Sequence, residues 1–169
     1  MKVGKIIFLY AFLTLALVSL TQAQEWRRIV PLQSTRADVE RLLGPAERSY
    51  GVVYELEAGN LSIEYSSGPC GGAKREGWNA PEETVISYSF SAKVKQRFAD
   101  LKLNRKKFKK VKDRHVGVID YYINAQEGIM YEVQNGEVDY VEYYPSRAYK
   151  HLYCGDSSAT PSSRQNLSP

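Results

Sequence analysis

The segment STRADVERLLGP, residues 34–45, has the spacing and the end signals of one short helix. Its apolar residues recur at helical intervals along one side and are Val39, Leu42 and Leu43. Ser34 or Thr35 can cap the N-terminus, and Gly44 suits the left-handed position that ends a helix. The pattern predicts a helix over Ser34–Leu43 whose apolar stripe packs on another element.

From Tyr50 the helical spacing changes to strict alternation, which is typical of a half-buried strand. A two-residue turn at Gly59 and Asn60 would form one hairpin and would pair Tyr54 with Tyr65. One face of this hairpin is apolar and carries Val52, Tyr54, Leu56, Ala58, Leu61, Ile63 and Tyr65. We expect this face in the core and the opposite, polar face in water.

Alternation returns in later segments, first where apolar residues alternate with serines over residues 86–91, and then over residues 116–123, 128–134 and 137–144. Asn135 and Gly136 favour a type I′ turn, because both central positions of that turn need positive φ. With this register one face carries Ile129, Tyr131, Val133, Val138 and Tyr140. Glu132 would then lie opposite Asp139, and the like charges would repel each other.

These patterns together predict an α+β domain over residues 24–154, an antiparallel sheet of five or six strands with the N-terminal helix on one face. Residues 93–114 have no clear period, and we expect a loop with one helical turn there. From Gly155 the sequence is small and polar, so residues 155–169 predict a disordered tail.

The N-terminus has the three parts of a secretory signal peptide. Two lysines precede an uncharged stretch from Ile6 to Leu20, and small residues follow up to Ala23. Cleavage after Ala23 would remove residues 1–23 with both lysines and would lower the formal net charge from +4 to +2. The apolar stretch is shorter than the roughly 20 residues of a membrane-spanning helix, and no cysteine near the cleavage site offers lipid attachment. We therefore expect a free exported protein, periplasmic or secreted.

Cys70 and Cys154 are the two cysteines of the chain. An exported protein folds in an oxidising compartment, so we expect a disulfide between them. The alternatives are an intermolecular bridge or two free thiols. A metal site is not expected, because these cysteines and His115 and His151 lack the paired spacing of zinc ligands.

Residues 101–115 contain eight basic residues against one acid, Asp113. The basic residues are Lys102, Arg105, Lys106, Lys107, Lys109, Lys110, Lys112 and Arg114. They could bind an anionic surface such as lipid headgroups or wall polymers, whereas nucleic acid is not expected as a partner outside the cell. They could equally form a solvated strip, or complement the acidic residues Glu127, Glu132, Glu137, Asp139 and Glu142.

The thirteen tyrosines of the chain include the doublets Tyr121–Tyr122 and Tyr143–Tyr144. They could form a platform for sugars or peptides. A sheet also prefers aromatic residues on its pleated surface, and we expect this structural role.

The chain has no motif of a serine nucleophile elbow, a paired-histidine zinc helix or a phosphate-binding loop. His115 and His151 could each act as an acid or a base, but neither has a motif partner. No catalytic residue and no cofactor is predicted, and a small hydrolase is the remote alternative. Asn60 and Asn166 match the glycosylation acceptor pattern, which matters only if the host glycosylates.

Thr35, Val39, Leu43 and Gly44 follow the spacing of a helical motif, and this stretch resembles the SmpA/OmlA family of small bacterial envelope proteins. The resemblance implies helices packed on a small antiparallel sheet and a role in binding. No functional residue carries over beyond the helix itself. We therefore expect a non-catalytic interaction or assembly module of the cell envelope or the secreted fraction, with a protein or polyanionic partner. The alternative is an electrostatic binder of anionic surfaces through Lys102 to Arg114.

Overall fold

The computed structural model describes residues 25–46, 51–71, 76–113 and 117–155. The predicted signal peptide, Arg114, His115, Asn166 and all but the first residue of the predicted tail lie outside these residues.

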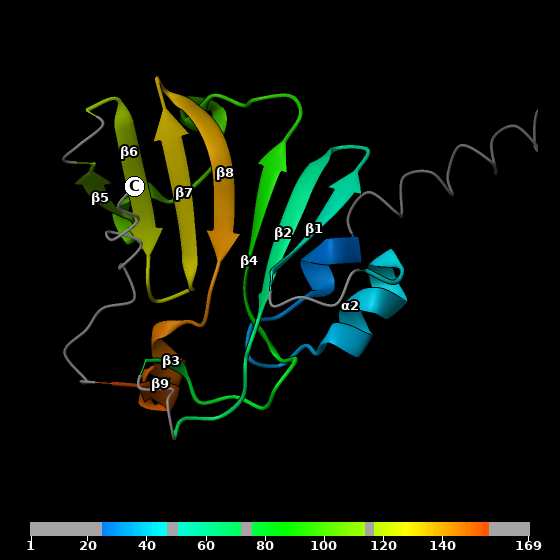
Figure 1. Ribbon diagram of the computed structural model, residues 1–169. Helices are drawn as coiled ribbons and strands as arrows, with labels where there is room; N and C mark the ends of the chain where they lie inside the picture. The colour runs from blue at the N-terminus through cyan, green and yellow to red at the C-terminus, as the bar shows by residue number, and fades with distance from the viewer. Residues whose placement is uncertain (1–24, 47–50, 72–75, 114–116, 156–169) are drawn as a thin grey trace, which may run out of the picture.

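An antiparallel seven-stranded sheet forms most of the structure, in the order β1-β2-β4-β8-β7-β6-β5 (Figure 1). Its strands are β1 (Gly51–Leu56), β2 (Gly59–Tyr65), β4 (Val85–Ala92), β5 (Lys109–Lys112), β6 (Ile119–Asn124), β7 (Ile129–Gln134) and β8 (Glu137–Tyr143). A smaller sheet pairs β3 (Gly77–Trp78) with β9 (Tyr153–Cys154). The antiparallel sheet and the disulfide are confirmed, but the sheet has more strands than the five or six predicted.

The additional strand is β5, which comes from the basic segment. Instead of a loop with one helical turn, residues 93–113 contain the 3-10 turns η2 (Phe98–Asp100) and η3 (Arg105–Lys107) and then β5. Val111 pairs with Tyr121 of β6, and lysines occupy the other positions of β5. Lysines on an outer strand discourage pairing with another strand. A strand that consists mostly of lysines also lacks the alternation of apolar and polar residues from which strands are predicted.

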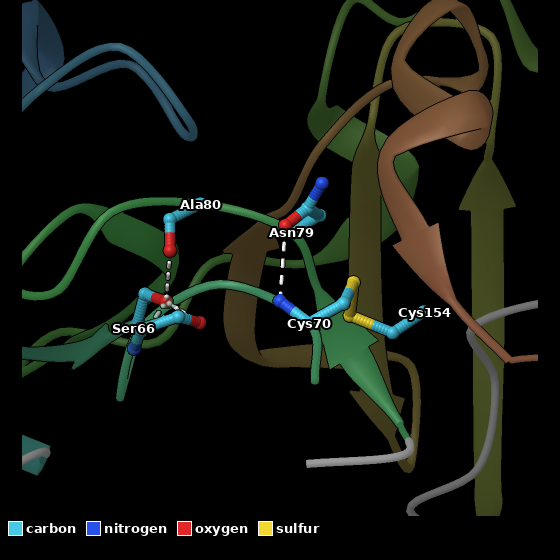
Figure 2. Close-up of a disulfide and its surroundings, with 6 residues drawn as sticks. Ser66, Cys70, Asn79, Ala80 and Cys154 are labelled. Carbon is cyan, nitrogen blue, oxygen red and sulfur yellow. Dashed lines mark hydrogen bonds between the residues drawn. A yellow bond between two sulfur atoms is a disulfide. The ribbon is translucent and has the colours of Figure 1, made fainter. Parts of the chain in front are cut away.

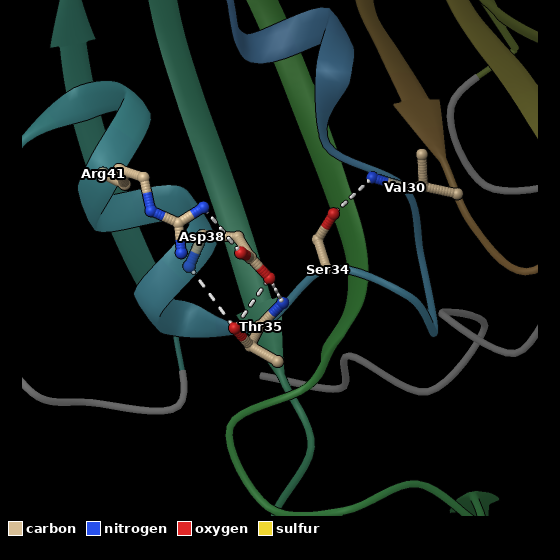
Figure 3. A network of polar contacts seen from close by, with 5 residues as sticks. All are labelled: Val30, Ser34, Thr35, Asp38 and Arg41. Carbon is tan, nitrogen blue, oxygen red and sulfur yellow. Dashed lines mark hydrogen bonds and ion pairs between the residues drawn. The ribbon is translucent and has the colours of Figure 1, made fainter.

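The helix α2 (Arg36–Leu43) forms close to the predicted bounds, and Thr35 is its N-cap. The Thr35 hydroxyl accepts from the Asp38 backbone N–H at 3.3 Å, and the Asp38 carboxylate accepts from the Thr35 N–H at 2.9 Å (Figure 3). Ser34 has a different role, because its hydroxyl accepts from the Val30 N–H. The two hydrogen bonds between Thr35 and Asp38 form a capping box. They satisfy backbone donors that would otherwise lack a partner at the start of the helix.

The hairpin of β1 and β2 forms, but its turn lies at Glu57 and Ala58 rather than at the predicted position. Tyr54 therefore pairs with Leu61. The reason is Gly59, where a Cβ would lie 2.2 Å from the Ser91 carbonyl oxygen of β4. Gly59 is thus the first residue of β2, where it lets β4 come close, and it is not part of the turn. The register changes by an even number of residues, so every strand residue keeps its predicted face, and only Ala58 leaves the core.

The hydrophobic core lies between this hairpin, β4 and the N-terminal segments. Val39 of α2 and Trp26 of η1 (Glu25–Arg28) pack on the apolar face of the sheet, and the Trp26 ring stacks on Phe90 at 4.7 Å. The sheet residues of the core are Val52, Tyr54, Leu61, Ile63, Tyr65, Val85 and Tyr88. We call this side of the sheet the covered face. Figure 1 shows α2 and η1 at the β1 and β2 end of the sheet.

The hairpin of β7 and β8 has its predicted turn at Asn135 and Gly136, both with positive φ. A register shift next to Glu132 changes the predicted pairing, so that Glu132 lies opposite Tyr140 and not Asp139. The predicted repulsion is therefore avoided, and Tyr140 moves to the face of Glu132. Asp139 is instead paired with Lys95.

The disulfide joins Cys70, in the loop after β2, to Cys154 of β9 (Figure 2). The Cys70 N–H donates to the side-chain oxygen of Asn79 at 2.9 Å, and the buried Ser66 hydroxyl donates to the Ala80 carbonyl at 3.0 Å. The loop before β4 is thus attached to the chain segment that follows β8.

Candidate functional site

The side of the sheet opposite the core is called the open face here. The core helices and Phe98 lie on the covered face, and no described helix contributes a core residue to the open face. In the described strands its acidic residues are Glu55, Glu64, Glu132, Glu137 and Glu142, and its basic residue is Lys109 at the β5 edge. The open face is therefore acidic across β1 to β7.

The centre of the open face is a row of three residues on neighbouring strands. Glu132 of β7 lies directly opposite Tyr121 of β6 on one side and Tyr140 of β8 on the other. Both tyrosine side chains lie close enough to the Glu132 side chain for its negative charge to raise their pKa values. We call Tyr121, Glu132 and Tyr140 the tyrosine–glutamate row. Directly opposite residues in an antiparallel sheet have Cβ atoms about 4.5–5.5 Å apart, so the row forms a continuous surface.

The environment keeps the tyrosines of this face protonated. Burial raises the pKa of Tyr121 to about 12, and the negative charges of Glu132 and Asp113 act in the same direction. Burial and the Glu132 charge also raise the pKa of Tyr140. Burial raises the pKa of Tyr144 to about 12, with Glu142 as the second cause. These phenols are therefore hydrogen-bond donors at neutral pH, and the carboxylates carry the charge of the face.

Apolar side chains lie directly beside the row. Ile123 of β6 pairs with Met130 of β7, and Met130 pairs with Glu142 of β8. All three side chains are half-buried. The arrangement offers carboxylates, phenols and flexible apolar surface within a few strand spacings, a combination that suits the binding of a chain with cationic and apolar groups.

Among the described basic residues of the predicted anion-binding patch, Lys109 lies on the open face, whereas Lys110 and Lys112 lie on the covered face. Arg105 donates to the carbonyl oxygens of Phe98 and Ala99, Lys107 pairs with Glu127, and Lys110 pairs with Asp120. The remaining ones in the described part of the chain, which make no ion pair there, are exposed and are Lys102, Lys106, Lys109 and Lys112. Lys107 therefore forms an ion pair with Glu127, one of the acidic residues that the basic segment was expected to complement.

Of the two histidines considered for catalysis, His115 lies outside the described residues. His151 is exposed, and its Nδ1 lies 3.1 Å from the Ala148 carbonyl oxygen. Among the described residues no group of three or more His, Cys, Asp or Glu side chains is arranged to hold a metal ion. Within the same residues there is also no helix of the length and apolarity that a membrane crossing requires.

The sequence pointed to tyrosines and to acidic residues on the last hairpins, but not to their combination. The row depends on the register of three strands and on the shift beside Glu132, which alternation within one strand cannot reveal. Comparison of the chain with family models, curated proteins and solved structures found no match.

Proposed function

We propose that this chain is an exported, non-catalytic interaction module that binds a basic partner on the open face of its sheet. The observation that carries the proposal is the tyrosine–glutamate row, in which one carboxylate lies between two protonated phenols. A partner with lysine or arginine side chains complements this face in charge.

The row is suited to hold a cationic side chain. The Glu132 carboxylate lies between two phenols, and its lone pairs can accept from an ammonium or guanidinium group. The tyrosine rings add attraction for a cation above their faces. Ile123 and Met130 can cover the aliphatic stem of a lysine or arginine. Since a β-sheet presents these groups in fixed positions, little conformational entropy is lost on binding.

Two further observations support export and binding. The disulfide between Cys70 and Cys154 is of the kind that forms and persists outside the cytoplasm. The N-terminal sequence has the pattern of a secretory signal peptide, and the helix motif resembles that of envelope proteins that act by binding.

The test uses an extended peptide that contains several lysines and leucines, and as matched probe the same peptide with acetylated lysines. Binding is measured by calorimetry and by amide chemical shifts of the labelled protein. We expect the charged peptide to bind, with shifts centred on β6 to β8, and the acetylated peptide to bind at least about tenfold more weakly.

The double variant Glu132→Gln/Glu142→Gln should weaken binding of the charged peptide by at least about tenfold. Its control is Glu57→Gln/Glu82→Gln, which makes the same charge change at two exposed positions outside the strands and should leave the affinity within about twofold. Equal losses in the two double variants would show that net charge alone attracts the peptide, and the proposal would be wrong.

A second candidate function is the binding of anionic surfaces, and the observation that favours it is the four exposed lysines without an ion pair in the described residues. Vesicles of phosphatidylglycerol should then bind the protein with an affinity that falls steeply with salt. Replacement of Lys102, Lys106, Lys109 and Lys112 by Ala should abolish this binding. Unchanged vesicle binding in that variant would exclude the basic segment as its cause.

A further inference from the structure

The strand β1 forms one edge of the main sheet, and β5 forms the other (Figure 1). An edge strand offers the backbone groups of its outer side to a further strand. Three of the four residues of β5 are lysines, a composition that discourages such pairing. β1 has the sequence GVVYEL, without lysine or proline, and its pairing with β2 has no register shift. Of the two edges, β1 is therefore the one that can accept another strand.

The backbone groups of Val53 and Glu55 point away from the sheet. The Lys93 N–H donates to the Ala58 carbonyl oxygen, so from Ala58 onward every second residue directs its backbone groups to β4, and the residues between them direct theirs to β1. Tyr54 is opposite one of the residues that face β1. Its neighbours Val53 and Glu55 therefore direct their N–H and C=O groups outward, where they have no hydrogen-bond partner among the described residues.

Apolar side chains at this edge are incompletely covered. The Val53 side chain lies on the open face, and the residue is 62% exposed. On the other side of the sheet Leu42 and Leu43 of α2 and Leu56 of β1 pack against the core but remain half-buried. Figure 1 shows α2 at this end of the sheet. A strand added to β1 would cover Val53 on one face and would extend the apolar layer on the other.

We propose that β1 pairs with β1 of a second copy of this chain, antiparallel, around a twofold axis at Val53. In this register Val53 lies opposite Val53 of the second copy, and the two residues exchange both backbone hydrogen bonds. Glu55, the charged residue of β1, lies opposite Gly51 of the second copy, so that the two carboxylates are not directly opposed. Val52 of each copy lies opposite Tyr54 of the other, which adds an apolar pair on the covered face.

The chemistry of β1 favours a second copy as the occupant of this edge. The twofold axis is perpendicular to the sheet, so the two covered faces lie on the same side, and the half-buried leucines of the two copies lie next to the junction. Because the lysines of β5 block the opposite edge, the assembly closes at two chains and does not grow into a fibre. The proposal does not rest on peptide binding, because the tyrosine–glutamate row lies on β6 to β8.

Sedimentation equilibrium of the disulfide-bonded protein, without any peptide, tests the self-association. We expect a monomer–dimer equilibrium with a Kd on the order of 100 µM or lower, as for a small interface. Val53→Lys should raise this Kd by at least about tenfold, because it places a charge on the edge. The control Val94→Lys makes the same change at a valine that is 79% exposed and lies outside the strands, and it should leave the Kd within about twofold.

A second variant addresses the backbone itself. Val53→Pro removes an N–H that points away from β2, so no hydrogen bond within the monomer is lost. It should abolish the dimer, while the amide spectrum of the variant shows that the monomer is folded. A folded Val53→Pro variant that dimerises like the natural protein would exclude pairing through this strand.

Amide hydrogen exchange locates the interface. The Val53 and Glu55 amides should exchange at least about fivefold more slowly at about 1 mM protein than at about 5 µM. The Lys112 amide at the β5 edge is the matched control. The neighbouring Asp113 N–H donates to the Ile119 carbonyl oxygen, so the Lys112 N–H points away from β6, and its exchange should not depend on concentration.

Three outcomes would overturn the proposal. The first is a protein that stays monomeric up to about 1 mM. The second is a dimer in which the Val53 and Glu55 amides remain unprotected, because its interface would lie on another surface. The third is protection of these two amides by the lysine and leucine peptide without self-association, which would show that β1 accepts a partner strand and not a second copy.

Discussion

The two halves of the main sheet share one hydrogen-bonded ladder but differ in how they are packed. In the helix-covered half, which is β1, β2 and β4, residues such as Leu61, Ile63 and Val85 are 0% exposed beneath α2 and η1. In the distal half, β5 to β8, most strand residues are half-buried on both faces, and irregular turns replace the helices. The difference shows that continuous strand pairing does not require a two-sided core. The half with less packing keeps polar and aromatic groups accessible, and the tyrosine–glutamate row lies there.

The largest expected effect concerns the link between the halves, the disulfide from Cys70 to Cys154 with a sequence separation of 84. Replacement of both cysteines by serine should lower the free energy of unfolding by about 4 kcal/mol, because a cross-link of this length restricts the unfolded chain. Urea unfolding of the oxidised protein and of the variant measures the difference. Reductant should destabilise the natural protein and leave the variant unchanged. A loss below about 1 kcal/mol would show that the two halves are stable without the link.

A valine-to-alanine change in each half of the sheet tests whether the two halves differ in packing. Val85→Ala in the helix-covered half should lower the free energy of unfolding by roughly 2 to 3 kcal/mol, since the residue is fully buried and its removal leaves a cavity. Val141→Ala, the same chemical change at a half-buried position of β8, should cost about 1 kcal/mol. Both values come from urea unfolding. If the two variants lose equal stability, the distal half is packed as tightly as the other, and the comparison is wrong.

Substitution of Gly59 and of Gly51 tests whether the close approach of β4 to β2 requires a glycine. Gly59→Ala should cost roughly 1 to 3 kcal/mol, because its Cβ would meet the Ser91 backbone, whereas Gly51→Ala at the β1 edge meets no atom within 4 Å and should be neutral. Thermal unfolding distinguishes them. Neutral behaviour of Gly59→Ala would mean that the two strands separate easily, and the observed register would need another explanation.

The smallest effect is a pH dependence at the start of α2, which belongs to the helix-covered half. Hydrogen bonds from the Thr35 backbone and side chain, with help from Arg41, lower the pKa of Asp38. A carboxyl group whose pKa is lower in the folded state contributes stability above its unfolded pKa, near 4, and loses that contribution as the pH falls through the folded value.

Asp38→Asn should therefore be less stable than the natural protein at pH 7, and the difference should shrink below pH 4. Glu76→Gln, at an exposed position in the loop before β3, removes a carboxylate away from the helix and is the control. A difference between Asp38→Asn and the natural protein that is constant from pH 7 to pH 2 would exclude an ionised capping box.

The sequence by itself determined the features that depend on neighbours along the chain. The capping residues of α2, the apolar face of the first hairpin and the turn at Asn135 and Gly136 follow from local spacing and backbone preference. The disulfide was expected from the two cysteines together with the N-terminal pattern that is typical of an export signal, and the structure has it.

Only the tertiary structure decided which strands are neighbours and which side chains meet across them. The approach of β4 to Gly59 moved the first turn, and the pairing of β5 with β6 converted part of a basic loop into a strand. The register shift beside Glu132 placed Tyr140 next to that carboxylate, and a bridge joined Arg97 to Glu137. These contacts join residues that are distant in sequence, and their stability depends on packing and hydrogen bonds of the whole sheet. A pattern within one segment does not contain this information, and for that reason the tyrosine–glutamate row could be recognised only in the folded chain.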